Sequence, residues 1–576
     1  MSKAKRATAK PNQAVSKAEK KAELKSKRGS DYQTTRRWPI IVAVGAPLLL
    51  FLFIYGMRLN HMIGHPNVDD GYYVLLAKAL ATGQGYTLIN TPTPGIMPIY
   101  PPAFVALLSL IFKLSPQFPQ NLWLLKLVSI AAMLGVGVVA YFYFARMREL
   151  PTYLALGIAA ATFLNPGLVH YATSTVMSEC VFAGAQLLAL VAVERCVRLK
   201  TAAAWRFALA GAVFAAFAFL TRSIGVTLIV AATVYLLKER LARAALIFVA
   251  AVSLLAGPWV IYARLHAPTP EQKQEQKGYI VEGYATQFWQ KSAGVSDSGT
   301  ITLSKLPERV WNNTADIVGQ QVGLIVALRL LQTLGRVGLG ILSFILSLLA
   351  LAGFVSVVRE RLTAAEIYAL LSLIMILLWP WEPVRFLLPL TPFLIFYILM
   401  GARAIHRWRR RGSGAVNWQA GPQTGFMTAT VLAWLLLALS VISHLDYIQA
   451  LDDQRLKGRG ELAEFDEVEA LLKWARENTP ADAVYASLNP PLVYLHTGRK
   501  TISAQEPIES WEMWKKLGVR YLVLTSPYGL PESDTEGKKI NIVYQSRRNP
   551  TLLVVDLGPP DTRAPWPNAP STASVN

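Results

Sequence analysis

Residues 337–357 read VGLGILSFILSLLALAGFVSV, a run without a single charged side chain. An apolar run of about 20 residues is long enough to cross a lipid bilayer as an α-helix. Similar runs recur along the chain, and hydrophobic residues make up 53% of the 576 residues while charged residues make up 16%. Soluble proteins carry about 25% charged residues. The composition therefore predicts a multi-pass α-helical membrane protein.

Eleven segments have the length and composition of membrane spans. They lie near residues 38–57, 121–145, 150–165, 178–196, 203–221, 223–238, 244–264, 337–357, 362–380, 384–401 and 427–444. Basic clusters precede the first segment and follow every second one: Arg36 and Arg37, Arg146 and Arg148, Arg195 to Lys200, Lys238 to Arg243, Arg359 and Arg361, and His406 to Arg411. Because Lys and Arg beside spans stay in the cytoplasm, the alternation predicts a cytoplasmic N-terminus and an outward C-terminal region.

One further apolar segment, residues 99–114, is predicted not to cross the membrane. Counting it as a span would move all later basic clusters to the outer side. Pro101 and Pro102 suit the start of a helix that lies along the outer interface. We therefore expect a long outer loop at 58–120 and a second one at 266–336.

The net charge of +21 does not indicate a nucleic-acid partner. Residues 1–37 hold twelve Lys and Arg against three acids, and much of the remaining positive charge lies between the apolar segments. This distribution favours cytoplasmic anchoring and contact with anionic membrane lipid. We predict a disordered basic tail at 1–37, followed by a transmembrane domain at 38–444.

The region 445–576 is predicted to form a small α/β domain outside the membrane, with a flexible C-terminal end. Helix patterns cover 462–475 and 508–517, and strand-like runs cover 483–488, 519–525 and 551–556. Cys180 and Cys196 lie at opposite ends of one span. They are too far apart to bond, so we expect no disulfide.

Charged residues at the outer ends of the spans are the candidates for chemistry. Asp69 and Asp70 are adjacent carboxylates, of which one is expected to cap a helix at 71–82; capping needs only one and leaves a catalytic role open. Glu179 begins the fourth span, where a capping role is the alternative. Arg222 and Arg385 lie in short outer turns, against the bias of basic residues. They suit a phosphate ligand, or they extend to the membrane surface without a ligand.

Several short motifs occur along the chain in a fixed order. Asp69-Asp70 follows the first span, Gly71-Tyr72-Tyr73 and Tyr100-Pro101-Pro102 come next, and Arg385 to Pro392 begins a late span. In this order they resemble the GT-C superfamily of integral-membrane glycosyltransferases. The branch most similar contains the dolichyl-phosphate-mannose–protein mannosyltransferases and the bacterial lipid A aminoarabinose transferase. The segments Asn478 to Val484 and Tyr494 to Lys500 resemble the outer end of bacterial members.

The resemblance implies an inverting transfer of a sugar from a polyprenyl-phosphate donor to an acceptor outside the cytoplasm, which is a glycolipid, a glycan or a protein. Our hypothesis for this reaction is Asp69 as the base, with Asp70 and Glu179 as supporting acids and Arg222 and Arg385 on the donor phosphate. Asp70 stands where many members have Glu, so the division of work between the two acids stays open. The donor and acceptor sites are expected to be lined by Tyr72, Tyr73, Tyr100, His170 and Glu382.

No sequence motif demands a metal or another cofactor. A divalent ion, Mg²⁺ or Mn²⁺, shared by Asp69, Asp70 and Glu179 is left open. The expected location is the bacterial cytoplasmic (inner) membrane. Two other functions stay open: a transporter or lipid flippase, although such proteins usually carry ionisable residues near the membrane midplane and repeated halves, and a non-catalytic scaffold.

Overall fold

The computed structural model describes residues 38–64, 69–199, 203–276, 279–292, 298–412, 421–504, 507–525 and 541–559. The predicted basic tail at 1–37 lies outside these residues. The chain divides into one unit that ends at Phe53 and a second that begins at Ile54. All sites discussed below belong to the second unit.

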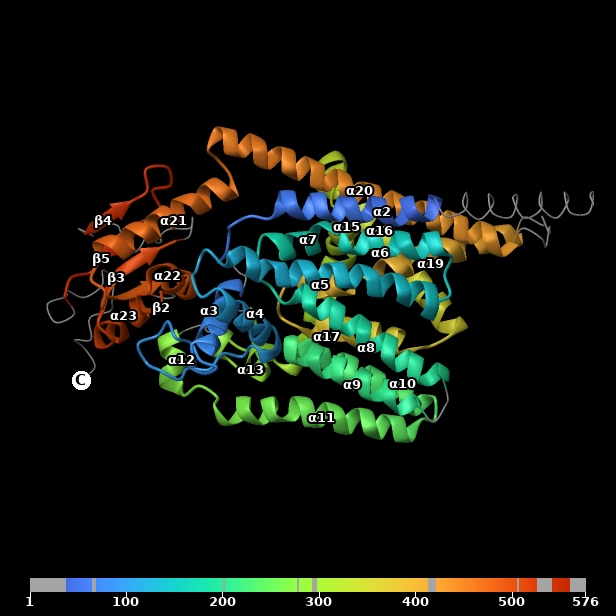
Figure 1. Ribbon diagram of the computed structural model, residues 1–576, viewed down its shortest axis with the longest axis horizontal. Helices are drawn as coiled ribbons and strands as arrows, with labels where there is room; N and C mark the ends of the chain where they lie inside the picture. The colour runs from blue at the N-terminus through green and yellow to red at the C-terminus, as the bar shows by residue number, and fades with distance from the viewer. Residues whose placement is uncertain are drawn as a thin grey trace, which may run out of the picture. The chain divides into compact units, whose positions relative to one another are not determined.

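Each predicted span coincides with a helix (Figure 1). The helices are α2 Trp38–Arg58, α5 Leu122–Phe142, α6 Thr152–Phe163, α8 Glu179–Leu199, α9 Ala204–Thr221, α10 Val226–Lys238, α11 Ala242–Leu265, α16 Leu330–Glu360, α17 Ala364–Leu378, α19 Thr391–Gly412 with α18 Val384–Leu387 before it, and α20 Gly421–Lys457. In the described chain, seven helices are long and apolar enough to cross a membrane, or eight if α6 and the adjoining α7 (Pro166–Thr173) form one bent span. The count of eleven is not confirmed, because Val42–Arg58, Ser223–Lys238 and Ala364–Leu378 are apolar but shorter.

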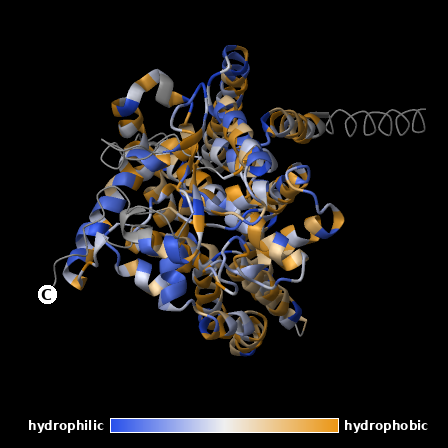
Figure 2. Cartoon of the chain, turned by 90° about the vertical axis from the view of Figure 1, so that its left-hand side faces the viewer, coloured by the Kyte–Doolittle hydropathy of each residue, from blue (hydrophilic) through white to orange (hydrophobic). Residues whose placement is uncertain are grey.

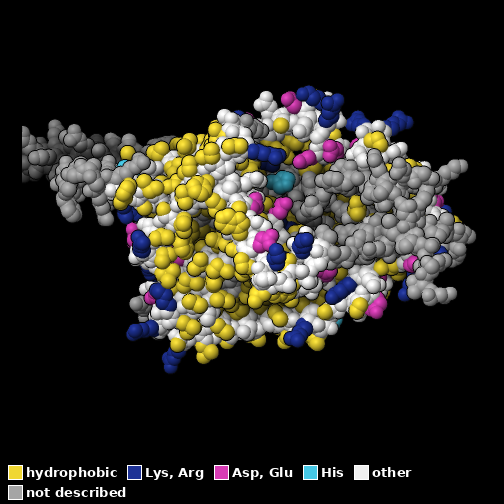
Figure 3. Space-filling model, turned by 180° about the vertical axis from the view of Figure 1, so that it is seen from behind, with side chains coloured by type: hydrophobic (Ala, Val, Ile, Leu, Met, Phe, Trp, Pro, Cys, Tyr) yellow, Lys and Arg dark blue, Asp and Glu magenta, His cyan; other side chains and the backbone are white. Residues whose placement is uncertain are grey.

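The long helices are apolar on their outside as well as inside. Leu246 and Leu254 of α11 and Val337 of α16 are 71%, 76% and 79% exposed. Figure 3 shows hydrophobic side chains covering a broad, continuous area that few charged side chains interrupt. Exposing an apolar surface of this extent is unfavourable in water but favourable in the lipid of a membrane. The protein is therefore an integral membrane protein.

Described members of several basic clusters lie at the same end of the helices: Arg198 donates to the Arg146 carbonyl, and Lys238 donates to the Leu362 carbonyl just before α17. Arg198 at the end of α8 pairs with Glu149 at 3.3 Å, and Arg407 of α19 pairs with Glu360 at the end of α16 at 3.1 Å. Glu179 begins α8 and so lies at the opposite end of that helix from Arg198. The structure thus separates a basic end from the end with the candidate acids, as the alternation of clusters predicts.

Short helices gather at the acid-bearing end. They are α3 Asp70–Ala81, α4 Pro102–Leu114, α12 Pro270–Gln276 and α13 Tyr284–Trp289. Helix α4, with Pro101 as its N-cap residue, has 13 residues and is shorter than the helices that can span. That 99–114 does not cross the membrane stays a prediction, because α10, which is expected to span, has the same length. Figure 1 shows α3 and α12 beside the C-terminal elements, and α3 contacts α22 while α12 contacts β2.

The C-terminal region forms a five-stranded sheet in the order β2-β1-β3-β5-β4. Strands β1 Val484–Ser487, β2 Thr501–Ser503 and β3 Val519–Leu524 are parallel, and β5 Leu553–Asp556 runs antiparallel to β3 and to β4 Ile542–Gln545. The helices are α21 Glu461–Asn478, α22 Pro490–Thr497 and α23 Pro507–Lys516. The sequence predicts β1, β3, β5, α21 and α23 correctly. In Figure 2 the elements beside the C-terminus are largely hydrophilic, in contrast to the orange helices at the lower edge.

Two glycines bring α16 and α19 into backbone contact. A Cβ at Gly353 would overlap the Tyr397 carbonyl oxygen, and a Cβ at Gly401 would overlap the Leu349 carbonyl oxygen. Small residues allow this close approach, and in lipid it is van der Waals packing of this kind that holds helices together. The pair therefore fixes the position of the helix that follows α18.

Gly401→Ala is expected to destabilise the protein by about 3 kcal/mol, because the added methyl must push two helix backbones apart. Thermal unfolding of the detergent-solubilised protein measures this effect. Gly257→Ala in α11 is the matched control, since no atom lies within 4 Å of its added methyl. Equal melting temperatures for the two variants would contradict the close packing.

Candidate active site

Asp69 is held at the entrance to α3 with its side chain turned toward two partners. It is the N-cap residue, yet its side chain makes no capping hydrogen bond. Instead, Oδ1 accepts a hydrogen bond from the Tyr100 hydroxyl at 2.9 Å, and Oδ2 pairs with the Arg385 guanidinium. The backbone carbonyl of Asp69 accepts from the amides of Tyr72 and Tyr73. The chain thus caps α3 through its backbone and leaves the carboxylate available for other contacts.

Asp70 points away from Asp69 and is fully buried. Its Oδ1 accepts from the amides of Gly64 at 3.1 Å and Gly71 at 2.8 Å, while Oδ2 has no hydrogen-bond partner among the described residues. Burial raises the pKa of Asp70 from 3.8 to about 6; the two backbone amides and the Lys126 ammonium oppose this shift only in part. Asp70 therefore braces the loop before α3.

The raised pKa of Asp70 has a consequence for stability. Folded Asp70 keeps its proton to higher pH than the unfolded chain does, so its ionisation between about pH 4 and about pH 6 lowers the stability of the folded state. We therefore expect the melting temperature of Asp70→Asn minus that of the wild type to increase as the pH rises from about 4 to about 7. Asp453→Asn, at an exposed position of α20, should show a smaller change. A difference that moves the other way would refute the assignment.

Two acids and two arginines form one buried chain of ion pairs. Arg385 from α18 pairs with Asp69 and also donates Nε to Glu179 Oε1 at 2.7 Å. Arg222, the C-cap residue of α9, reaches the same Glu179 oxygen at 2.7 Å and Ser178 Oγ at 3.2 Å. The four formal charges sum to zero. Glu179 thus holds both guanidinium groups together, and its side chain is fully buried.

The C-terminal region supports the loop that carries the acids. Asn489, the N-cap residue of α22, donates Nδ2 to the Gly64 carbonyl at 2.7 Å. Gly64 has a φ of +75°, and a Cβ there would lie 3.0 Å from this amide nitrogen. A Cβ at Gly71 would already lie 3.2 Å from Pro491, so α3 begins in close contact with α22. The position of the acid pair depends on this contact.

A cavity of about 870 Å³ opens beside the ion pairs, and its size suits a small ligand or a headgroup. Asp69, Arg222 and Arg385 lie on its wall, with Tyr73, Tyr100 and Glu382 among the other predicted residues. Burial, and then the Asp69 charge, raise the pKa of Tyr73 above its ordinary value, so its hydroxyl stays neutral. Glu179 holds the arginines from behind. The predicted residues that are not part of the cavity lining are Asp70, Tyr72, His170 and Glu179 itself.

Several cavity residues were not identified from the sequence. They are Tyr171, Tyr284, Gln287, Lys291, Trp379 and Trp381. The two tryptophans occur just before Glu382 and Arg385, and this aromatic turn at a membrane boundary is a signal that the sequence did contain. Tyr284 comes from the segment between α11 and α16, and it reaches the site because that segment packs on the one before α4, with the Ile99 amide donating to the Ile280 carbonyl at 2.9 Å. A local pattern does not reveal such a contact.

The three acids proposed to share a metal do not meet at one point. In the described part of the chain, their oxygens do not form a group within 4.8 Å of one another. Arg385 already bridges Asp69 and Glu179, and Asp70 faces the Gly64 amide instead. A divalent ion at these acids stays a prediction, and binding there would require Arg385 to move.

Known structures with a similar fold show the structural class of this protein. No protein-family model and no curated protein matches the sequence. Among solved structures, the chain is similar to ArnT from Cupriavidus metallidurans bound to undecaprenyl phosphate, with a TM-score of 0.53 and 14% identity over 90% of this chain and 97% of that one. For apo ArnT the TM-score is 0.53, with 12% identity over 91% and 98% of the two chains.

The archaeal oligosaccharyltransferase AglB from Archaeoglobus fulgidus, solved with an inhibitory peptide and a dolichol-phosphate, gives a TM-score of 0.48 and 15% identity over 83% of this chain and 69% of that one. The likeness to ArnT, at nearly full length of both chains, establishes the fold. The chain has the fold of ArnT, in agreement with the GT-C-like fold that its motifs predict.

Proposed function

We propose that this protein is an inverting membrane glycosyltransferase that moves a sugar from a polyprenyl-phosphate carrier to an acceptor outside the cytoplasm. The observation that carries the proposal is a cavity in which a buried carboxylate, Asp69, lies directly beside a guanidinium, Arg385. ArnT, which has the same fold, is solved with undecaprenyl phosphate. This supports a lipid phosphate as the carrier. The acceptor is a glycolipid, a glycan or a protein.

In the proposed reaction, Asp69 takes a proton from the acceptor hydroxyl as the acceptor oxygen bonds to the anomeric carbon of the sugar. The bond from that carbon to the phosphate oxygen breaks, and its electron pair leaves with the lipid phosphate. Attack from the face opposite the phosphate inverts the anomeric configuration. A phosphate leaves readily, so the reaction needs no general acid. Tyr100, which donates to Asp69 Oδ1 at 2.9 Å, orients the base.

The arginines have two tasks in this proposal. A donor phosphate offers Arg385 and Arg222 a further anionic partner, with the geometry that guanidinium groups bind best. They stabilise the charge that develops on the phosphate as the sugar leaves. When Arg385 turns toward the phosphate, Asp69 loses its counter-ion and becomes a stronger base. Donor binding and activation of the base are thereby coupled.

The proposal has a definite orientation in the membrane. The N-terminus and the basic end of the helices lie in the cytoplasm, and the cavity and the region 445–576 lie outside, in the bacterial cytoplasmic membrane. The separation of the basic end from the acid-bearing end supports this orientation. The transmembrane domain then covers 38–444, and the two outer loops at 58–120 and 266–336 both contribute residues such as Tyr100 and Tyr284 to the cavity wall.

Mass spectrometry of a deletion strain tests the proposed reaction type. We expect one envelope component to lose a sugar and the corresponding polyprenyl-phosphate sugar to accumulate, because its consumption is blocked. Re-expression of the wild-type gene should reverse both changes. A strain that keeps all its envelope sugars, or that loses a sugar without building up a lipid-linked donor, would contradict the proposal.

A further inference from the structure

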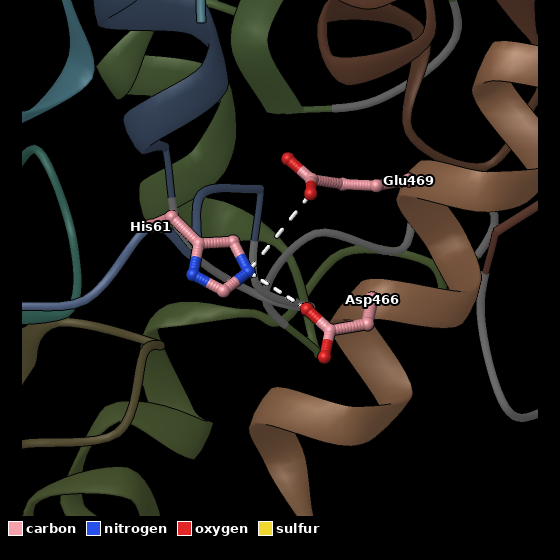
Figure 4. A group of neighbouring side chains, drawn as sticks. All are labelled: His61, Asp466 and Glu469. Atoms are coloured by element: carbon pink, nitrogen blue, oxygen red, sulfur yellow. Dashed lines mark hydrogen bonds and ion pairs between the residues drawn. The ribbon is translucent and has the colours of Figure 1, made fainter. Parts of the chain in front are cut away.

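A second cluster of ligating side chains lies outside the cavity (Figure 4). His61 follows α2, and Asp466 and Glu469 belong to α21. His61 Nε2 is 2.9 Å from Asp466 Oδ1 and 3.9 Å from Glu469 Oε2, and the ligand atoms of the three residues all lie within 4.8 Å of one another. Figure 4 shows the three side chains pointing toward one another across the space between the loop and the helix.

The backbone holds these side chains in place. Asp466 and Glu469 are three residues apart on α21 and so project from the same face of the helix, while Leu471 and Ala475 on the other side are fully buried. On the loop, Lys126 Nζ donates to the carbonyls of Asn60 at 2.9 Å and Met62 at 2.8 Å, on either side of His61. Both halves of the cluster are thus fixed by contacts that do not involve the cluster itself.

The cluster carries more negative than positive charge, which favours binding of a cation. Two carboxylates face one imidazole, and among the described residues His61 is their one ion-pair partner. The side chains of His61, Asp466 and Glu469 are 47%, 64% and 33% exposed. An ion can therefore reach all three from solution. Neighbouring carboxylates repel each other, and a divalent cation between them removes that repulsion.

We propose that His61, Asp466 and Glu469 bind a divalent cation of the zinc class, with water completing its coordination. One imidazole nitrogen and two carboxylate oxygens are a donor set that Zn²⁺ accepts. Mg²⁺ prefers oxygen ligands and water, so it binds here more weakly. The bound ion connects the loop that leads to Asp69 with α21 of the C-terminal sheet. This site goes beyond the transfer reaction and does not depend on it.

Calorimetric titration of ZnCl₂ into the full-length, chelator-treated protein in detergent tests the site. We expect one tight equivalent in the wild type, and an affinity about 100-fold lower in His61→Ala and in Glu469→Gln, because each removes a ligand. The control variants are His266→Ala, which removes an exposed histidine elsewhere, and Asp69→Asn. Both should bind zinc as the wild type does. Zinc should also raise the melting temperature of the wild type but not that of His61→Ala.

Three results would overturn the proposal. The first is a wild-type protein that takes up no zinc. The second is unchanged zinc affinity in folded His61→Ala and Glu469→Gln. The third is loss of binding in Asp69→Asn alone, which would move the ion to the cavity acids. Glu469→Gln is the safer of the two test variants, because it preserves the size of the side chain and the helix that carries it.

Discussion

Asp69→Asn is expected to slow sugar transfer by about 10²- to 10⁴-fold, the usual contribution of a positioned base. The amide keeps an oxygen that can accept from Tyr100, so the loop should retain its shape. It cannot take the acceptor proton, and it cannot form the ion pair with Arg385. Initial rates with the purified protein in proteoliposomes, normalised to folded protein, measure the effect.

Asp70→Asn is the matched control for this experiment. Asp70 has the same chemistry one residue along the chain, but it lies outside the cavity lining and accepts from the Gly64 and Gly71 amides. We expect it to lose less than Asp69→Asn, through a shifted loop and not through a missing base. Equal or greater loss in Asp70→Asn would give the role of base to Asp70.

Arg385→Met is expected to reduce kcat by about 10²- to 10³-fold, as removal of a preorganised charge-stabilising donor does, and to raise KM for the lipid donor. The change removes the guanidinium that joins Asp69 to Glu179, so it also leaves Asp69 without its ion-pair partner. Arg385→Lys keeps the charge but lacks the rigid fork. It should fall between Arg385→Met and the wild type.

Arg264→Lys serves as the control for the arginine series, because Arg264 is exposed at the end of α11 and is absent from the cavity lining. It should leave both kinetic constants unchanged. If folded Arg385→Met kept the donor KM and kcat of the wild type, Arg385 would have no part in binding the phosphate. Arg222→Met would then identify whether Arg222 carries that role alone.

Local sequence patterns predict the helices well. Membrane helices satisfy their backbone hydrogen bonds internally, so the length of an apolar run in the sequence gives the length of the helix. The same patterns do not establish the number of spans. Helix α10 begins only after the break at Arg222 and Ser223, and α17 ends before Pro380, so both are shorter than a full span. In the sheet, β2 has three residues, too few for a periodic pattern, and β4 is largely exposed.

The charges of the site are visible in the sequence, but their pairing is not. Asp69, Glu179, Arg222 and Arg385 stand out because they lie at helix ends that the sequence predicts to face outward, and the structure joins them in one chain of ion pairs. That Arg385 serves two acids depends on contacts over more than 200 residues of sequence. The opposite directions of Asp69 and Asp70 follow from the turn into α3, which no periodicity specifies.

The release of free polyprenyl phosphate distinguishes sugar transfer by Asp69 from every other role of this cavity. Lipids from the deletion strain supply the donor, and purified wild-type and Asp69→Asn proteins are compared in proteoliposomes that contain envelope acceptors. The account predicts that the wild type releases one polyprenyl phosphate for each sugar transferred, with inverted anomeric configuration, and that folded Asp69→Asn releases almost none. Equal release by both proteins, or no release by the wild type, would contradict it.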